Sequence, residues 1–185
     1  MSEQDPGIRP QARGAEFPFG NKVARAAWQF AWLLLARWTP PPLHGWRRLV
    51  LKAFGAEIGV GARVYASVRI WQPRNLRVGD GAIIGPRVRI YNQGRIAIGA
   101  HAVVSQEASI CASTHDPHDR DFALLLKPVT IGEGCWVAAE AFVGPGVTMQ
   151  SGAILGARGA LFQDAEALTI YRGNPAEPIG RRTTG

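Results

Sequence analysis

The chain has 185 residues, a formal net charge of +7 and a hydrophobic fraction of 46%. This length suits one domain with a core of its own, together with an N-terminal appendage. The basic residues are spread along the chain without a nucleic-acid-binding motif, so we expect no nucleic acid partner. Cys111 and Cys135 occupy positions that favour compact apolar residues, which predicts neither a disulfide framework nor a metal site.

The N-terminal segment, residues 1–21, is polar and rich in Pro and Gly. It lacks the basic stretch followed by an apolar run that marks a secretory signal peptide. We therefore expect a disordered tail and a cytoplasmic protein.

Residues 22–54 are predicted to form two helices separated by the break Pro40-Pro41-Pro42. The apolar stretch of the first helix, residues 26–36, is too short to span a bilayer. Trp, Arg and Lys side chains surround it, as in helices that lie at a membrane interface. Two roles stay open and can coexist: capping of the domain that follows, and contact with an anionic membrane.

Residues 55–170 repeat an aliphatic side chain every six positions, with Gly or Ala frequent beside it. The repeated positions are Ile58, Val64, Ile70, Val78, Ile84, Ile90, Ile98, Val104, Ile110, Ile131, Val137, Val143, Met149, Leu155 and Leu161. A period of six fits neither an amphipathic helix nor a long strand, and it predicts a solenoid of stacked triangular coils. A sandwich of short strands is the alternative, but it would show a period of two. Extra residues at Leu76-Arg77 and Ile96-Ala97 are expected to bulge at one edge.

The repeat is interrupted once, by the loop 113–128, which begins Ser113-Thr114-His115-Asp116-Pro117-His118. Histidine titrates near neutral pH and is a frequent acid or base in catalysis. The interruption is therefore the predicted place for chemistry, and residues 171–185 after the last coil are predicted to be a C-terminal tail.

These landmarks resemble the hexapeptide-repeat acyltransferases, whose fold is a left-handed parallel β-helix. The resemblance covers Gly55 to Arg182. It rests on Ile90-Tyr91-Asn92-Gln93-Gly94, the Thr-His-Asp-Pro loop, Lys127 to Gly132, Val143 to Val147 and Gly173-Asn174-Pro175-Ala176. Trp46-Arg47-Arg48 with Phe54-Gly55-Ala56 resembles the colanic acid branch, which is related to the maltose and galactoside O-acetyltransferases. The resemblance implies the left-handed winding, acetyl-CoA as acyl donor, and a homotrimer with active sites between subunits.

The same resemblance implies that His115 is the general base for direct acyl transfer, which needs no covalent enzyme intermediate. His118 is a competitor without a counterpart in the family. Asp116 is the second catalytic candidate, because it could fix the orientation of His115, although a backbone carbonyl could do the same. Its alternative role is to cap the turn of its own loop.

Asn92 and Gln93 are the predicted acceptor-binding residues. The resembling sugar acetyltransferases carry an acidic residue at this level, so the amides here imply a different acceptor. Asn92 could hydrogen-bond a sugar hydroxyl or stabilise a tight corner.

Ala139 and Ala157 are predicted to leave room for the pantetheine arm of the donor. Arg158 could reach a CoA phosphate or be solvated, and Arg181 and Arg182 resemble the basic tail that meets the nucleotide end of CoA. Trp136 is expected to fill the outer face beside these positions.

Together these interpretations predict an acetyl-CoA-dependent O-acetyltransferase that acts on a saccharide hydroxyl in exopolysaccharide or other glycan assembly, without a metal. One alternative is a metal-dependent enzyme like the γ-class carbonic anhydrases, with His101, His115 and His118 as ligands. The other is a non-catalytic repeat scaffold.

Overall fold

The computed structural model describes residues 19–119 and 121–183. Most of the predicted tail, residues 1–18, lies outside this range, and residues 19–21 belong to the first helix. Two helices precede the coils, α1 (Phe19–Leu35) and α2 (His44–Ala53). In the described part of the chain, neither helix has the length and apolarity needed to cross a bilayer.

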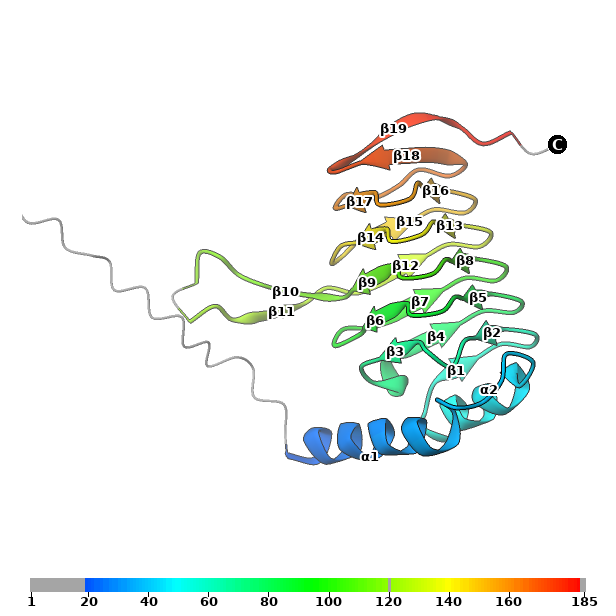
Figure 1. Ribbon diagram of the computed structural model, residues 1–185. Helices are drawn as coiled ribbons and strands as arrows, with labels where there is room; N and C mark the ends of the chain where they lie inside the picture. Colours follow the sequence, from blue (N-terminus) through cyan, green and yellow to red (C-terminus); the bar gives the residue numbers. More distant parts are fainter. Residues whose placement is uncertain (1–18, 120, 184–185) are drawn as a thin grey trace, which may run out of the picture.

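The coils form a three-sided parallel β-helix, as predicted (Figure 1). Sheet A consists of β1 (Glu57–Ile58), β4 (Leu76–Val78), β7 (Ile96–Ile98), β12 (Val129–Ile131) and β15 (Thr148–Met149). Sheet B contains β2 (Arg63–Val64), β5 (Ile83–Ile84), β8 (Val103–Val104), β13 (Trp136–Val137), β16 (Ile154–Leu155), β18 (Thr169–Gly173) and β19 (Ala176–Arg181). Sheet C contains β3 (Arg69–Ile70), β6 (Arg89–Tyr91), β9 (Ser109–Cys111), β14 (Phe142–Val143) and β17 (Ala160–Leu161).

The repeated aliphatics point inward and all fifteen are buried. Parallel pairing stacks them in register, so that Ile58, Val78 and Ile98 form one column inside sheet A. Successive coils pack so closely at one corner that a Cβ on Gly79 would lie 2.5 Å from the backbone nitrogen of Ala100. The six-residue period therefore arises from the buried columns of the core. The small residue after each aliphatic is required by the close contact between successive coils.

The extra residues of the first coils do not lie where we predicted. Leu76-Arg77 and Ile96-Ala97 are strand residues of β4 and β7. The chain instead lengthens just before them, at the corner that leads from sheet C to sheet A, through the 3-10 turn Pro73–Asn75 and through the turn at Gln93-Gly94. The interruption 113–128 leaves from this same corner one coil later, as an antiparallel hairpin of β10 (Ser113–His115) and β11 (Leu124–Leu126).

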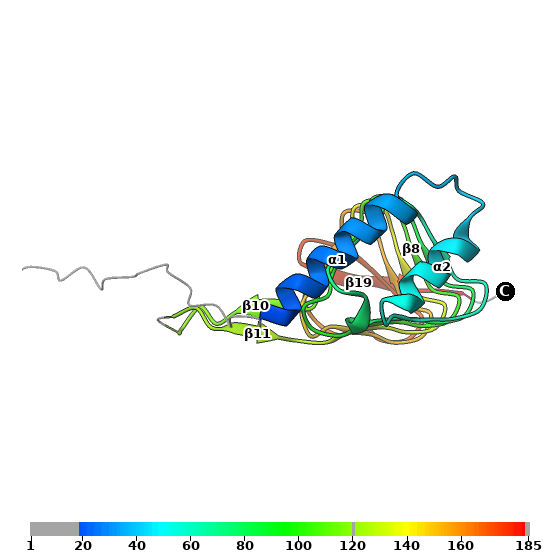
Figure 2. The same ribbon diagram turned by 90° about the horizontal axis from the view of Figure 1, so that it is seen from below.

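The two helices cover the first coil from below (Figure 2). The open edge of that coil presents carbonyl groups that no further coil can pair. Side chains from the helices donate to them: Trp28 to Ile70 (2.8 Å), Trp32 to Ala66 (3.2 Å), Arg47 to Val64 (2.6 Å) and Arg48 to Ala62 (2.9 Å). The capping role predicted for this segment is thus built from hydrogen bonds to a strand edge.

The predicted C-terminal tail also differs from what we find. Residues 171–181 continue sheet B in β18 and β19, which pair in antiparallel fashion beyond β16. Tyr171 is buried, and its hydroxyl accepts a hydrogen bond from the backbone of Glu166 (3.0 Å). The antiparallel strand closes the upper end of the solenoid, where the six-residue pattern has already ended and gives no signal.

Candidate functional site

The hairpin of β10 and β11 projects from the solenoid at the level of β9 (Figure 1). It adds thirteen residues to one coil, because Ile98 pairs with Ile131, whereas the earlier pairing of Val78 with Ile98 spans twenty positions. Sheets A, B and C pair across the insertion without a gap. The hairpin is therefore an appendage on an unbroken ladder, and it carries His115 at the end of its first strand.

His115 is exposed, and its Nδ1 lies 2.6 Å from the carbonyl oxygen of Phe122. A carbonyl oxygen can only accept, so Nδ1 carries the proton in the neutral ring and Nε2 keeps a free lone pair. The ring is thereby oriented with its basic nitrogen away from the hairpin backbone. This is the arrangement that a general base requires.

Asp116 does not contact the His115 ring by any hydrogen bond found in the described residues. Its backbone N–H donates to Ala123 (3.1 Å), and its Oδ1 accepts from the backbone of His118 (2.9 Å). Of the two roles that sequence left open, the geometry favours the turn cap. The Phe122 carbonyl holds the imidazole instead.

Asn92 is fully buried at the corner between sheets C and A. Its Oδ1 accepts from the backbone of Gln72 (3.1 Å) and its Nδ2 donates to the carbonyl of the same residue (2.5 Å). These bonds tie two successive coils together. The side chain is thus engaged in corner stabilisation, the second role that sequence left open for it.

Gln93 lies at the same corner, with its Nε2 donating to the Tyr91 hydroxyl (3.1 Å). Its Oε1 is buried and has no partner among the described residues. Tyr91 packs edge-on against Trp71, with ring centroids 4.9 Å apart, and the Arg25 guanidinium lies 3.8 Å from the centre of the Trp71 ring. The Trp71 Nε1 and the Arg25 Nε are likewise buried without partners in this part of the structure.

Sequence reasoning missed Trp71, Tyr91 and Arg25 as candidates for this corner. The signal available was weak: two aromatic residues that follow repeated aliphatics, at positions twenty apart. Cys111 continues the same row, because it pairs with Tyr91, and the hairpin begins two residues later. The row of Trp71, Tyr91 and Cys111 therefore leads along one edge towards His115.

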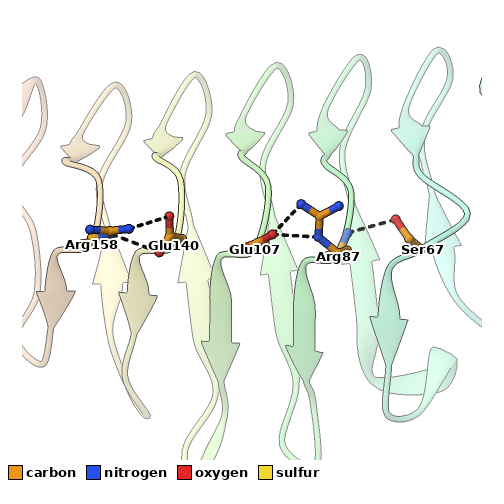
Figure 3. Close-up of polar contacts among 5 residues, drawn as sticks. All are labelled: Ser67, Arg87, Glu107, Glu140 and Arg158. Atoms are coloured by element: carbon orange, nitrogen blue, oxygen red, sulfur yellow. Dashed lines mark hydrogen bonds and ion pairs between the residues drawn. The ribbon is translucent and has the colours of Figure 1, made fainter.

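Ala139 and Ala157 lie at a different corner, the one that leads from sheet B to sheet C. The backbone N–H of Arg158 donates to the Ala139 carbonyl (2.9 Å), which stacks these turns directly. Charged side chains form a row along this corner (Figure 3): Arg87 with Glu107, and Arg158 with Glu140. Arg158 Nε lies 3.0 Å from Glu140 Oε2, and this carboxylate raises the pKa of the guanidinium.

Arg181 and Arg182 do not reach the corner of Ala139 and Ala157. Arg182 Nη1 donates to the Gly134 carbonyl (2.8 Å), at the corner between sheets A and B. The antiparallel return of β19 carries both arginines there. Arg172, which we did not predict, lies beside Ala157 instead: a Cβ on Gly156 would be 3.6 Å from its Cγ. It is exposed and makes no ion pair within the described residues.

Apart from Arg181 and Arg182, the predicted site residues thus divide into two groups at opposite ends of sheet C. The hairpin and the Gln93 corner lie at one end, and Ala139, Ala157 and Arg158 lie at the other. Within residues 19–119 and 121–183, no three His, Cys, Asp or Glu side chains cluster in a way that could hold a metal ion. Trp136 lies on the outer side of sheet B, where its Nε1 donates to Ser105 Oγ (2.9 Å).

No protein-family model matches the chain. The chain is similar over 166 residues to a protein of Escherichia coli (strain K12) named "Putative colanic acid biosynthesis acetyltransferase WcaF". The two are 39% identical, and the match covers 90% of this chain and 91% of the relative.

Two solved structures are similar in fold. A galactoside acetyltransferase in complex with coenzyme A has a TM-score of 0.81 at 19% identity, covering 91% of this chain and 85% of that one. A hexapeptide-repeat acetyltransferase from Vibrio cholerae, complexed with acetyl coenzyme A, has a TM-score of 0.79 at 18% identity, covering 88% of this chain and 89% of that one. These likenesses confirm the predicted left-handed β-helix.

Proposed function

The chain belongs to the colanic acid biosynthesis type of hexapeptide-repeat acetyltransferases, and on this premise we propose that it transfers an acetyl group from acetyl-CoA to a saccharide hydroxyl. The observation that carries the proposal is the His115 hydrogen bond to the Phe122 carbonyl (2.6 Å), which leaves Nε2 free as a base. The acceptor is a glycan of exopolysaccharide assembly.

The reaction follows from this tautomer. As the sugar oxygen attacks the thioester carbon, Nε2 takes the hydroxyl proton and the imidazolium forms. The Phe122 carbonyl, at Nδ1–H, stabilises that cation. When the tetrahedral intermediate collapses, the carbon–sulfur bond breaks and Nε2–H returns the proton to the leaving thiolate, so the enzyme ends in its starting state.

We propose that the acceptor binds at the Gln93 corner. Gln93 Oε1, Trp71 Nε1 and Arg25 Nε have no hydrogen-bond partner within residues 19–119 and 121–183, and they supply one acceptor and two donors beside an aromatic face. Buried polar atoms of this kind are costly unless a ligand or water satisfies them. Sugars offer both hydroxyl groups and an apolar face, and they suit such a surface.

We propose that acetyl-CoA binds along the corner of Ala139 and Ala157, and that this corner meets the hairpin of a neighbouring copy in a homotrimer. The outer side of sheet B supports such a contact. Its outward residues form an apolar column on five successive coils: Ile83, Val103, Trp136, Ile154 and Ile170. An apolar stripe of this length favours contact between copies.

Arg158 can contribute to donor binding only if a CoA phosphate displaces Glu140. Arg172 is the better placed cation, because it stands at the same corner without an ion pair in the described residues. In the proposed site Arg172 therefore contacts a CoA phosphate, and Arg181 and Arg182 do not.

The proposed location is the cytoplasm with peripheral contact at an anionic membrane. No Asp or Glu occurs in residues 17–56, while Lys22, Arg25, Arg37, Arg48 and Lys52 do. The exposed residues of the two helices include large apolar side chains: Phe30, Leu33, Leu34, Trp46 and Leu49. A helix that is apolar on its solvent side as well as on its packed side favours a lipid interface.

This location is tested by flotation with vesicles that contain about 30% phosphatidylglycerol, which gives a membrane surface with about one negative charge per three lipids. The double substitution Phe30→Glu with Leu34→Glu should weaken binding to the vesicles at least tenfold. Ile179→Glu, at the opposite end of the solenoid, is the control and should bind as the unaltered protein does. Equal binding of all three forms would remove the membrane from the proposal.

The reaction is tested by thiol release from acetyl-CoA with a panel of nucleotide sugars and short glycans. His115→Ala should lower acceptor-dependent release by about a hundredfold or more, the usual scale of a lost general base. His118→Ala is the matched control, because this residue stands in the same hairpin, and it should retain most of the activity. If His115→Ala keeps full activity, the proposed base is wrong; if the unaltered protein does not bind CoA, the acetyl donor is wrong.

A further inference from the structure

A groove of about 580 Å³ lies between α1 and the first two coils, on the outer side of sheet C. Its size falls in the range of small-molecule sites. The floor is largely apolar: the buried Trp28 and Trp32 line it, together with Leu33, Trp71 and Tyr91. Neither the hairpin nor the donor corner contributes to it.

The rim of the groove is cationic. Arg37 follows α1, while Arg69 and Arg89 point outward from β3 and β6, which pair with each other. All three are exposed, and none forms an ion pair within the described residues. The lining contains no Asp or Glu. Guanidinium groups collected in this way bind phosphate through charge-assisted hydrogen bonds.

Apart from the three arginines and the aromatic residues, the polar side chains of the lining are those of Gln29 and Ser67. The indole N–H groups of Trp28 and Trp32 already donate to the Ile70 and Ala66 carbonyls. Among the lining residues, the buried polar atom without a partner in the described structure is Trp71 Nε1, which is a donor. A nucleobase or sugar would need acceptors as well as donors, whereas a hydrocarbon chain needs neither.

We infer that this groove binds a phosphate ester carried on a hydrocarbon chain, with the chain on the floor and the phosphate among Arg37, Arg69 and Arg89. Trp71 and Tyr91 line both the groove and the Gln93 corner. A saccharide attached to the phosphate would therefore extend towards the proposed acceptor site. This extension rests on the proposed function, in which the acceptor is a saccharide, but binding in the groove does not.

The test is calorimetric titration of the full-length protein without acetyl-CoA, so that its result does not depend on acetyl transfer. The probes are dodecyl phosphate and dodecyl maltoside, both below their micelle concentrations, and inorganic phosphate. Dodecyl phosphate should bind saturably and at least tenfold more tightly than either comparison probe. Farnesyl phosphate and dihexanoyl phosphatidic acid then distinguish a single-chain lipid carrier from a bilayer phospholipid, and tighter binding of either one supports the inference.

Arg69→Glu with Arg89→Glu should weaken dodecyl phosphate binding at least tenfold. Arg63→Glu is the control, because Arg63 is an exposed arginine of the same coil that points outward from sheet B. It should leave binding unchanged, and all variants should unfold at the same temperature as the unaltered protein, as evidence of folding. The inference would be overturned if dodecyl phosphate failed to bind, or if dodecyl maltoside bound as tightly as dodecyl phosphate. It would also be overturned if the Arg69→Glu, Arg89→Glu variant bound dodecyl phosphate as tightly as the Arg63→Glu variant does.

Discussion

The side chain of His115 is held by one backbone carbonyl, and this contact explains how a single histidine on an exposed hairpin can have a defined orientation. The Phe122 residue that supplies the carbonyl has a left-handed backbone, with φ of 47°. That conformation is uncommon for a bulky residue and places its carbonyl towards the ring. The neighbouring Asp116 is left to hold the turn.

At the residue scale, the motif around His115 identified the base that we propose, but sequence could not separate binding from structural roles. Asn92 and Asp116 would use the same polar atoms in a functional role as in a structural one. Only the positions of their partners, Gln72 and His118, distinguish the two roles. The position of Arg182 could not be predicted, because it depends on the antiparallel return of β19. Arg172 was missed because no pattern in the sequence places it beside Gly156.

His44 gives a prediction at this scale. Burial lowers its pKa below the ordinary value of 6.5, and the nearby Arg47, Arg63 and Arg48 lower it further, whereas a hydrogen bond to the Val64 carbonyl raises it. The unfolded chain therefore binds more protons than the folded one below about pH 6.5. The free energy of unfolding should be highest above that pH and should fall as the pH drops through 6.5 towards the folded pKa.

Chemical denaturation at pH 7.5 and pH 5.5 measures this loss. His44→Gln, which cannot be protonated, should show a smaller difference between the two pH values than the unaltered protein. The same difference in both forms would show that the pH dependence originates at other groups.

At the element scale, the hairpin and the ladder are separable. Sheets A, B and C pair directly across the insertion, and the backbone N–H of Lys127 donates to the Ala112 carbonyl (2.9 Å), so the chain leaves and returns at one point. The interruption of the repeat therefore predicted a loop correctly. Its antiparallel pairing could not be predicted, because the apolar run at Leu124, Leu125 and Leu126 has no alternation.

Replacing residues 114–125 by two glycines should remove acetyl transfer while the solenoid stays folded. Thermal unfolding should shift by no more than a few degrees, which corresponds to roughly 1 kcal/mol for a domain of this size. CoA binding should persist. Loss of the folded state would show that the hairpin supports the ladder and is not an appendage.

At the scale of the whole molecule, the proposed site is incomplete in one chain. The base and the Gln93 corner lie at one end of sheet C, and Ala139 and Ala157 lie at the other. The β-helix predicted from the six-residue period accounts for this separation, since a rigid coil fixes which corner each residue occupies. Periodicity predicts the coil but not which outer face meets a neighbour; the apolar column on sheet B becomes visible only in the folded chain.

The most direct test of the account is acetyl transfer by mixed oligomers of two inactive variants. His115→Ala removes the base, and Ala157→Trp fills the corner proposed for the donor. Each variant alone should be at least about a hundredfold less active than the unaltered protein. Refolded together, they should recover a substantial fraction of the activity, because some interfaces then pair an intact His115 with an intact donor corner. If both variants are inactive and mixing restores nothing, the base and the donor do not meet between copies, and the proposed site is wrong.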